Sequence, residues 1–338
     1  MQQKTAMRVV ALEEHFSLPE LVQEIDPRRI ASRGWPRPDE RPPEMAHIEE
    51  LKEVGANRIA GMDEAGVTVQ VLSVSGPGAD LLPPEKGPQF ARSYNDWLKQ
   101  AIGKYPGRFA GFAHLPMTAP EAAADELERC VRELGFCGAL INGLTDNRFL
   151  DDPFFGPILA RAEALDVPIH LHPNVPPEAV RNSYFAGLPG PTGFLLSSPG
   201  WGWHAETAVH ILRMVLAGTL EKYPRLKIII GHMGEGLPAM LTRVDNIFTQ
   251  TTSSYLKRTV SQTILDQVWI TTSGFFSLPP FLAALTSFGV DRILFSVDYP
   301  FSQNHVAMKF LADLPVSPAD REKIAHGNAD RLLKLQPA

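Results

Sequence analysis

Eight short runs of apolar and β-branched residues recur along this chain of 338 residues, and they constrain its fold more than any other feature. Strands that are apolar on both faces are typical of a parallel sheet covered by helices. We expect strands over residues 8–16, 67–74, 108–115, 137–142, 167–172, 226–232, 268–272 and 292–298. The pattern therefore predicts an α/β protein built on parallel strands.

The segments between these runs mostly have helical spacing. We expect helices over residues 48–64 (with a stop at Gly66), 88–104, 119–134, 153–165, 205–221, 235–249, 278–288 and 318–334. Eight βα units of this length fit a (β/α)8 barrel, which we expect to span residues 1–338 as one domain. A doubly wound open sheet is the alternative, but no Gly-x-Gly-x-x-Gly turn follows the first strand.

Two segments rich in proline and glycine interrupt the alternation. Residues 17–47 include Ser32-Arg33-Gly34-Trp35-Pro36-Arg37-Pro38 and are too rich in proline for a helix. Residues 173–203 end in Pro199-Gly200-Trp201-Gly202-Trp203. Loops of this length in a compact domain are usually functional or disordered, and we interpret both segments as insertions in the barrel.

The composition excludes several classes of protein. A hydrophobic content of 44% and a net charge of −6 describe a globular protein without the basic excess that nucleic acid binding needs. The N-terminal residues MQQKTAMR lack a signal-peptide core, and no apolar run is long enough to span a membrane, so we expect a cytoplasmic protein without a membrane partner. Cys130 and Cys137 are expected to be reduced core thiols rather than a disulfide.

The first apolar run ends in a Glu-x-His pair. Because side chains alternate along a strand, Glu13 and His15 are expected on one face and Glu14 on the other. A carboxylate and an imidazole on one face at the end of a strand can hold a divalent metal ion from two sides. Alone, this pair is a weak motif.

Three further runs also end in ionisable side chains, namely His172, His232 and Asp298. Each alone has an ordinary explanation, such as a turn former or a hydrogen-bonded histidine. In a barrel, however, the carboxyl ends of all strands meet at one mouth, where active sites lie. The same coincidence at strand after strand therefore predicts a metal site.

Five motifs give the chain a family resemblance. They are Leu12-Glu13-Glu14-His15-Phe16, Leu171-His172-Pro173, Gly231-His232-Met233-Gly234-Glu235, Thr271-Thr272-Ser273-Gly274 and Ile293-Leu294-Phe295-Ser296-Val297-Asp298-Tyr299-Pro300-Phe301. Together they resemble the amidohydrolase superfamily, and more narrowly its metal-dependent decarboxylase branch, which includes γ-resorcylate, 2,3-dihydroxybenzoate and 5-carboxyvanillate decarboxylases. The resemblance runs from about residue 8 to the C-terminus and is weakest over residues 17–47 and 173–200.

The resemblance implies a role for each motif residue. It implies one divalent ion, Mn²⁺ in preference to Zn²⁺, with the ligands Glu13, His15, His172 and Asp298. His232 would stand beside the ion or reach the substrate. Glu235, expected at the start of the next helix, would orient His232.

Other side chains are expected at the substrate. Arg243 resembles the family's contact to the substrate carboxylate or ring hydroxyl group, although a solvated helix arginine explains it equally well. Asn142 ends the fourth predicted strand, and His114 ends the third, where resorcylate-type enzymes have a small apolar residue. Trp203 is either an aromatic lid or a packing residue.

The resemblance implies a non-oxidative decarboxylase. Its substrate would be a small aromatic acid of the ortho-hydroxybenzoate type, and Asp298 would protonate the ring carbon that loses CO₂. A hydrolase of a lactone or amide on the same barrel is the first alternative; the Glu-x-His opening and the absence of an obvious carboxylated lysine argue against it. A binding protein without turnover is the second. Family members are commonly homodimers or homotetramers.

Overall fold

The computed structural model describes residues 7–36, 40–43 and 46–335, and every structural statement below concerns these residues. Each predicted apolar run contains one strand. The strands are β1 (Val10–Phe16), β2 (Val69–Val74), β3 (Phe109–Gly111), β4 (Ala139–Asn142), β5 (Pro168–His172), β6 (Lys227–Ile230), β7 (Val268–Thr271) and β8 (Ile293–Leu294). The prediction of an α/β protein with parallel strands is confirmed.

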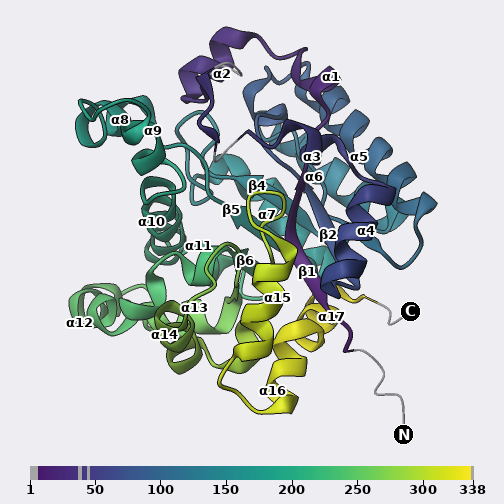
Figure 1. Cartoon of the computed structure of the whole chain (residues 1–338). Coiled ribbons are helices and arrows are strands. Elements are labelled where there is room, and N and C mark those ends of the chain that lie inside the picture. The colour runs from purple at the N-terminus through teal and green to yellow at the C-terminus, as the bar shows by residue number, and fades with distance from the viewer. Residues whose placement is uncertain (1–6, 37–39, 44–45, 336–338) are drawn as a thin grey trace, which may run out of the picture.

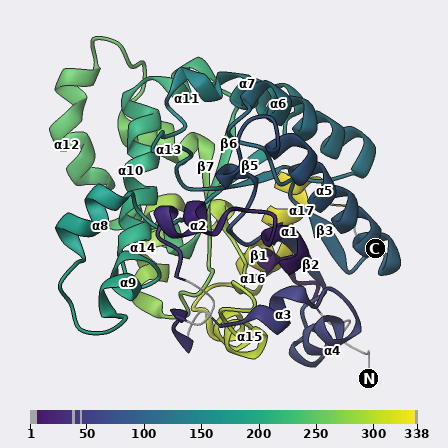
Figure 2. The same cartoon turned by 90° about the horizontal axis from the view of Figure 1, so that it is seen from above.

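Helices follow or precede nearly every strand and surround the strands (Figures 1 and 2). They are α1 (Pro19–Val22), α2 (Pro27–Arg33), α3 (Ile48–Lys52), α4 (Ala56–Ala65), α5 (Gly87–Lys104), α6 (Pro120–Arg129), α7 (Gly156–Leu165), α8 (Glu178–Tyr184), α9 (Thr192–Ser197), α10 (Gly202–Leu216), α11 (Thr219–Lys222), α12 (Leu241–Thr252), α13 (Val260–Gln267), α14 (Leu278–Phe288), α15 (Asn304–Asp313), α16 (Pro318–Glu322) and α17 (Asn328–Leu333).

The strands form two parallel sheets that adjoin each other. One sheet has the order β1-β2-β3 and the other β4-β5-β6-β7-β8, so neighbours in space are also neighbours in sequence. Ala113, just after β3, forms a parallel bridge with Ala139 of β4. The N–H of Cys137 also donates to the carbonyl of Gly111 at 3.0 Å. The first sheet therefore continues into the second.

At the other edge, β8 is much shorter than the predicted run over 292–298, because the backbone beyond it pairs with side chains and loops. The Oγ of Ser296 accepts the N–H of Glu13 at 2.8 Å. The carbonyl of Tyr299 accepts the N–H of His15 at 2.7 Å. These contacts bring the segment after β8 against the end of β1.

Apolar side chains from both sheets share an inner core. This cluster includes residues of β1, β2, β4, β6 and β8, together with residues of α17: Val10, Leu12, Val69, Val71, Phe112, Cys137, Leu140, Ile229, Leu294, Ala329, Leu332 and Leu333. A larger cluster lies against the helices. The strands are thus buried on both faces, as their near-continuous apolar runs predict.

The segment 17–47 is not the helix-free loop that its proline content predicts. It contains α1 and α2, each with a proline in its first turn. Proline is compatible with the start of a helix because the N–H it lacks would have no partner there. Asp26 caps α2 by accepting the N–H of Arg28 at 2.9 Å. Residues 37–39 and 44–45 of this prediction lie outside the described residues.

Other boundaries also differ from the prediction. The segment 173–203 holds α8 and α9, and the predicted helix over 235–249 begins only at Leu241. Gly234 and Gly236 have φ of 80° and 83°, which interrupt a right-handed helix. The helices α13 and α15 are not predicted. The predicted stop at Gly66, with φ of 88°, is confirmed and ends α4.

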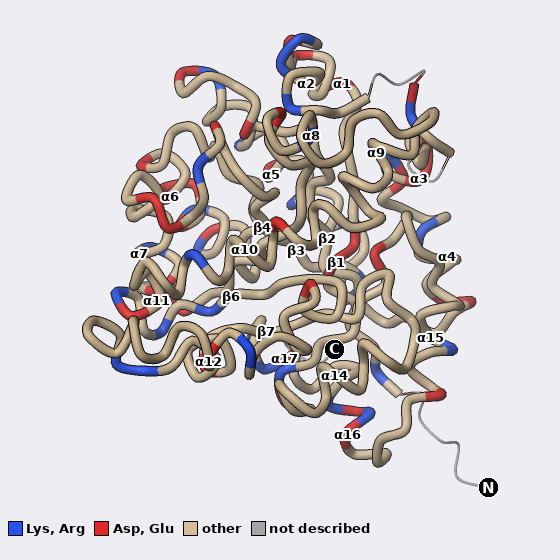
Figure 3. The backbone as a smooth tube through the Cα atoms, turned by 90° about the vertical axis from the view of Figure 1, so that its left-hand side faces the viewer, with Lys and Arg blue, Asp and Glu red and all other residues tan. Residues whose placement is uncertain are grey.

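The distribution of surface charges and the state of the two cysteines agree with what the composition predicts. Lys and Arg are interspersed with Asp and Glu over the outer helices (Figure 3). Among the described residues, we find no helix with the length and apolar character needed to cross a bilayer. Cys130 and Cys137 are buried free thiols, as predicted.

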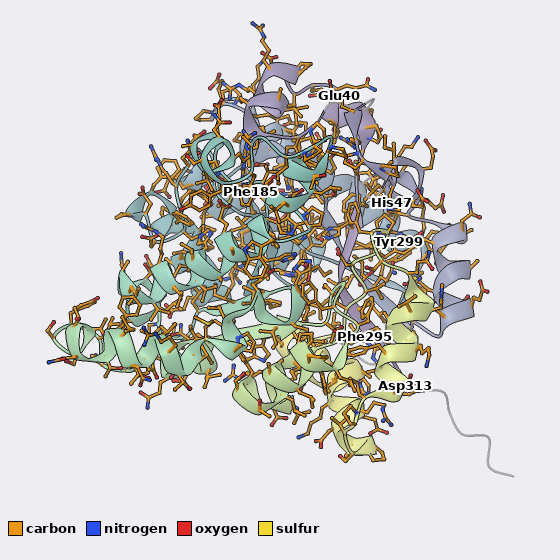
Figure 4. All side chains as sticks on the ribbon, turned by 60° about the vertical axis from the view of Figure 1, so that its left-hand side comes forward. Glu40, His47, Phe185, Phe295, Tyr299 and Asp313 are labelled. Carbon is orange, nitrogen blue, oxygen red and sulfur yellow. The ribbon has the colours of Figure 1, made fainter. Side chains whose placement is uncertain are left out.

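Because the strands are parallel, their carboxyl ends lie at one end of the molecule. Figure 4 shows the chain passing from Phe295 to Tyr299 toward the end where Glu40, His47 and Phe185 lie. Asp313 lies toward the opposite end (Figure 4). The two insertions therefore stand over the carboxyl ends of the strands, where the predicted site residues lie.

Candidate metal centre and active site

The four predicted metal ligands lie together at the carboxyl ends of the strands. One ligand atom from each lies within 4.8 Å of the others: Glu13, His15, His172 and Asp298. β1 supplies the first two, the end of β5 supplies His172, and the segment after β8 supplies Asp298. The parallel fold thus brings together side chains from segments that lie far apart in the sequence.

Glu13 is fully buried and held on one side only. Its Oε2 accepts hydrogen bonds from Thr271 Oγ1 at 2.7 Å and Ser273 Oγ at 2.5 Å. Among the residues that the structure describes, its Oε1 has no hydrogen-bond partner, and neither does Nε2 of His15. Buried polar atoms normally have partners. Two orphaned atoms of metal-ligand type facing one cluster fit a divalent cation.

Hydrogen bonds orient both histidine ligands. His172 Nδ1 lies 2.8 Å from the carbonyl of Pro173, which makes Nδ1 the donor and leaves Nε2 free for a metal. His15 Nδ1 lies 3.4 Å from Ser73 Oγ, and its Nε2 lies 3.2 Å from Oδ1 of Asp298. Both imidazoles therefore present Nε2 to the cluster.

Burial sets the charge state of the ligands. It lowers the pKa of His172 to about 3, so this imidazole is neutral, the form that binds metals. Burial raises the pKa of Glu13, but the positive charge of His232 and the nearby imidazole of His170 outweigh burial and hold that pKa well below its ordinary value. The cluster thus combines a carboxylate with a neutral imidazole.

Glu14 lies behind the cluster and holds the segment that carries Asp298. It is fully buried, and its Oε1 accepts the N–H of Val297 at 2.9 Å. Its Oε2 accepts the N–H of Tyr299 at 3.2 Å. Asp298 lies between these two residues with φ of 74°, in the left-handed region. Sequence reasoning places Glu14 on the opposite face from Glu13 but gives it no role.

His232 and Glu235 form the predicted pair. His232 Nδ1 donates to Glu235 Oε1 at 2.8 Å, and its Nε2 lies 3.8 Å from Oδ2 of Asp298. Burial lowers the pKa of His232, but the charges of Glu235 and Glu13 outweigh it and raise that pKa well above its ordinary value. Glu235 stands in an irregular turn with φ of 57°, not at the start of a helix as predicted.

A cavity of about 420 Å³ opens beside the cluster. His172, His232 and Asp298 line it, and so does Asn142, as predicted. Most of the remaining wall comes from the two insertions and from the segments after β7 and β8: Trp35, Pro36, Arg41, Leu195, Pro199, Gly200, Trp203, His204, Gly274, Phe275, Phe301 and Ser302. Its aromatic walls suit a planar ring. Trp203 thus lines the cavity and is also buried, so both predicted alternatives, a lid and a packing residue, stay open.

The structure does not bring two predicted substrate contacts to the cavity. His114 is buried, and its Nε2 accepts the N–H of Ala79 at 2.9 Å. In this position it supports the backbone at Ala79, does not line the cavity, and has its acceptor atom already used, so its contact to a substrate stays a prediction. Arg243 is exposed on α12 and does not line the cavity. Arg41 is instead the cavity-lining Lys or Arg among the described residues.

Two more histidines lie in this region. His170 is buried, with Nε2 at 3.3 Å from Oε2 of Glu13. His204 lines the cavity and contacts Glu235. His204 follows Trp203 in the sequence, but nothing in the local pattern indicates its partner, which is far away along the chain.

Comparisons with known proteins give a consistent result. The family model described as "Amidohydrolase" matches residues 21–335. A γ-resorcylate decarboxylase from Polaromonas sp. (strain JS666 / ATCC BAA-500) is 40% identical, with 96% of this chain and 98% of the relative covered.

Two solved structures are similar along their whole length. One is a 2,6-dihydroxybenzoate decarboxylase complexed with 2,6-dihydroxybenzoate, with a TM-score of 0.84 and 36% identity; 97% of this chain and 100% of that chain are covered. The other is a dihydroxybenzoic acid decarboxylase from Polaromonas sp. JS666 with bound manganese and the inhibitor 2-nitroresorcinol. Its TM-score is 0.87 at 37% identity, with 98% of each chain covered. The chain belongs to the amidohydrolase family.

Proposed function

We propose that this protein is a metal-dependent, non-oxidative decarboxylase that converts an aromatic acid of the ortho-hydroxybenzoate type into CO₂ and a phenol. The observation that carries the proposal is the ligand cluster at one end of an aromatic-walled cavity of about 420 Å³. Relatives named as γ-resorcylate decarboxylases cover nearly the whole chain, and one related structure has bound manganese and the inhibitor 2-nitroresorcinol.

The proposed ligands of one divalent ion are Glu13, His15, His172 and Asp298. When bound, the ion supplies a template and a Lewis acid for the carboxylate and the adjacent ring oxygen. Mn²⁺ is favoured over Zn²⁺ because the site mixes carboxylates with imidazoles and must admit substrate oxygens. Trp203, Phe275 and Phe301 of the cavity wall then hold the ring.

Asp298 starts the reaction as a carboxylate. Burial raises its pKa, but the close imidazoles of His15 and His232 outweigh burial and hold that pKa below its ordinary value. Asp298 therefore takes the proton of the ortho hydroxyl group and passes it to the ring carbon that bears the carboxylate. The bond to the carboxylate carbon then breaks, its electron pair restores the aromatic ring, and CO₂ leaves. The phenolate regains a proton from solvent.

His232 and Arg41 complete the proposed site. The raised pKa of His232 keeps a positive charge beside Asp298 and the substrate anion. Arg41 lines the cavity, and burial lowers the pKa of its guanidinium. We therefore assign the contact to a substrate anion to Arg41, in place of Arg243. Asn142 contributes a polar group at the end of β4.

We extend the proposal to the architecture. The hydrogen bonds between the ends of β1 and β8, and the inner core shared by both sheets, support a closed (β/α)8 barrel that forms one domain. Exposed apolar side chains support a homodimer or homotetramer. They lie on α8, α12 and α14 and before α10: Tyr184, Trp201, Ile247, Leu278 and Leu282. The free thiols support a cytoplasmic location.

A substrate panel tests the reaction. The enzyme is loaded with Mn²⁺ and incubated under nitrogen with 2,6-, 2,3- and 2,4-dihydroxybenzoate, salicylate and 5-carboxyvanillate, while ultraviolet spectra and released CO₂ are recorded. We expect CO₂ release from at least one acid, its loss after chelation and its recovery on adding Mn²⁺. Survival of every acid beside hydrolysis of a simple lactone or amide would replace this proposal with a hydrolase.

A further inference from the structure

Glu235 stands between two imidazoles, and each of its oxygens serves one of them. His232 Nδ1 lies 2.8 Å from Oε1, and His204 Nδ1 lies 2.5 Å from Oε2. Since a carboxylate can only accept, both Nδ1 atoms carry the protons. The Glu235 side chain is fully buried, so these two hydrogen bonds fix its orientation. The His204 and His232 rings also meet edge to face, with centroids 4.6 Å apart.

His204 comes from a different part of the chain than the pair it supports. It lies in the first turn of α10, directly after the cavity wall formed by residues 195–203. Its Nε2 lies 3.0 Å from the carbonyl of Pro199 and 3.1 Å from Nε1 of Trp203, both of which belong to that wall. His204 therefore connects the wall of the cavity to Glu235.

We propose that His204 is a positioning residue: through Glu235 it fixes the orientation of His232, so that Nε2 of His232 points toward Asp298 and the substrate. The three side chains have ligand atoms within 4.8 Å of one another. They do not form a second metal site, because both oxygens of Glu235 are already used by Nδ1 protons. The proposal rests on the proposed function for the identity of the reaction, but its geometry does not depend on it.

A double-mutant cycle tests the proposal. The variants are His204→Leu, Glu235→Gln and the double variant, measured as Mn²⁺-loaded enzymes with the best acid of the panel. We expect His204→Leu to lower kcat about 10- to 100-fold with KM and metal content nearly unchanged, as for other partners that orient a catalytic histidine. Because His204 acts through Glu235, the double variant should be no slower than Glu235→Gln alone.

Two further variants separate positioning from folding. His204→Gln keeps a side-chain N–H donor for Glu235 and should recover most of the lost kcat. His210→Gln is the matched control, since His210 is buried on the same helix and its Nε2 accepts the N–H of Leu150, away from the cavity. It should keep wild-type kcat. If the kcat losses of the two single variants multiplied in the double variant, the positioning role would be refuted. A rise in KM without a loss of kcat in His204→Leu would refute it as well.

A structural measurement keeps the test independent of the reaction. In a crystal structure of His204→Leu, the Glu235 carboxylate should rotate and the His232 ring should occupy more than one orientation. If no acid is decarboxylated by the wild-type enzyme, the proposed function fails while this measurement still decides the role of His204. An unchanged His232 ring in that variant would overturn the inference.

Discussion

Glu14 holds Asp298 from behind by accepting the backbone N–H groups of both of its neighbours. The acceptor distances are 2.9 Å to Val297 and 3.2 Å to Tyr299. Asp298 has φ of 74°, a conformation that costs a residue other than glycine about 1–2 kcal/mol. The hydrogen bonds to Glu14 compensate for this cost. Glu14, which lies between Glu13 and His15 in β1, thus holds the segment that brings Asp298 to the cluster.

We expect Glu14→Gln to impair both activity and stability. The amide nitrogen replaces one acceptor oxygen with a donor, which leaves a buried N–H beside Asp298 without a partner. The free energy of unfolding should fall by about 1–3 kcal/mol. We expect kcat to fall about tenfold or more, as it does when a partner of a metal ligand is lost.

Urea unfolding and steady-state kinetics measure the two effects. Glu64→Gln makes the same chemical change on the exposed face of α4 and should match the wild type in both. Wild-type kcat in Glu14→Gln would show that the segment after β8 keeps Asp298 in place without Glu14.

We expect Asp298→Asn to abolish turnover while leaving metal bound. Asparagine cannot carry the proton to the ring carbon, so kcat should fall by at least about 100-fold. Glu13, His15 and His172 remain to hold the ion. Metal analysis of the dialysed protein beside kinetics checks both parts. An active variant would remove Asp298 from the mechanism. A variant that loses the metal would contradict the expectation that the other three side chains hold the ion without Asp298.

We expect Ser273→Ala to weaken metal binding. Ser273 Oγ donates to Oε2 of Glu13 at 2.5 Å and so directs Oε1 to the cluster. Loss of such a partner typically costs about 10- to 100-fold in metal affinity. Titration with Mn²⁺ measures the change, and Ser287→Ala, whose hydroxyl bonds within α14, should bind like the wild type. Equal affinities in both variants would contradict the orienting role.

We expect buried histidines to make the protein less stable in acid. Burial lowers the pKa of His114 from 6.5 to about 4. Between these values the unfolded chain binds a proton that the folded protein does not, so the free energy of unfolding falls as pH falls. Each unit by which the pKa is shifted changes the free energy of unfolding by about 1.4 kcal/mol, so the whole shift of His114 changes it by about 3 kcal/mol.

The variant His114→Gln isolates this contribution, since glutamine can still accept the N–H of Ala79 but does not titrate. Its free energy of unfolding should decrease less than that of the wild type between pH 6.5 and 4. His210, whose pKa burial lowers to about 3, contributes equally to both proteins. Parallel curves for the two proteins would show that His114 is not protected from protonation.

Most of the strand order and the clustering of the four predicted ligands could be predicted from sequence, because both depend on local patterns. A run that is apolar on both faces indicates a buried strand, and a polar residue at its end indicates the mouth of the fold. Glu13, His15, His172 and Asp298 all follow this rule. The lengths of β3 and β8 could not be predicted, since the neighbouring side chains decide where the backbone ladder stops.

The rest of the site depends on contacts between distant segments. His114 also ends a predicted strand, but Ala79 uses its acceptor atom, and no local pattern reveals this. The predicted helix that carries Arg243 begins later than expected, and its arginine is exposed on α12. Glu14 and His204 were missed because their partners lie 285 and 31 positions away.

Much of the cavity wall comes from the two insertions, whereas the four predicted metal ligands come from the strands and the segment after β8. Glu13, His15 and His172 belong to the paired strands β1 and β5, and Asp298 belongs to the segment that Glu14 holds. Trp35, Arg41, Leu195 and Trp203 belong to the insertions. Substitutions in these insertions can therefore reshape the cavity without disturbing the cluster of the four predicted ligands. Under the proposed function, substrate preference would be an evolvable property, separable from metal binding, and exchanging the insertions between homologues would be the route to engineering it.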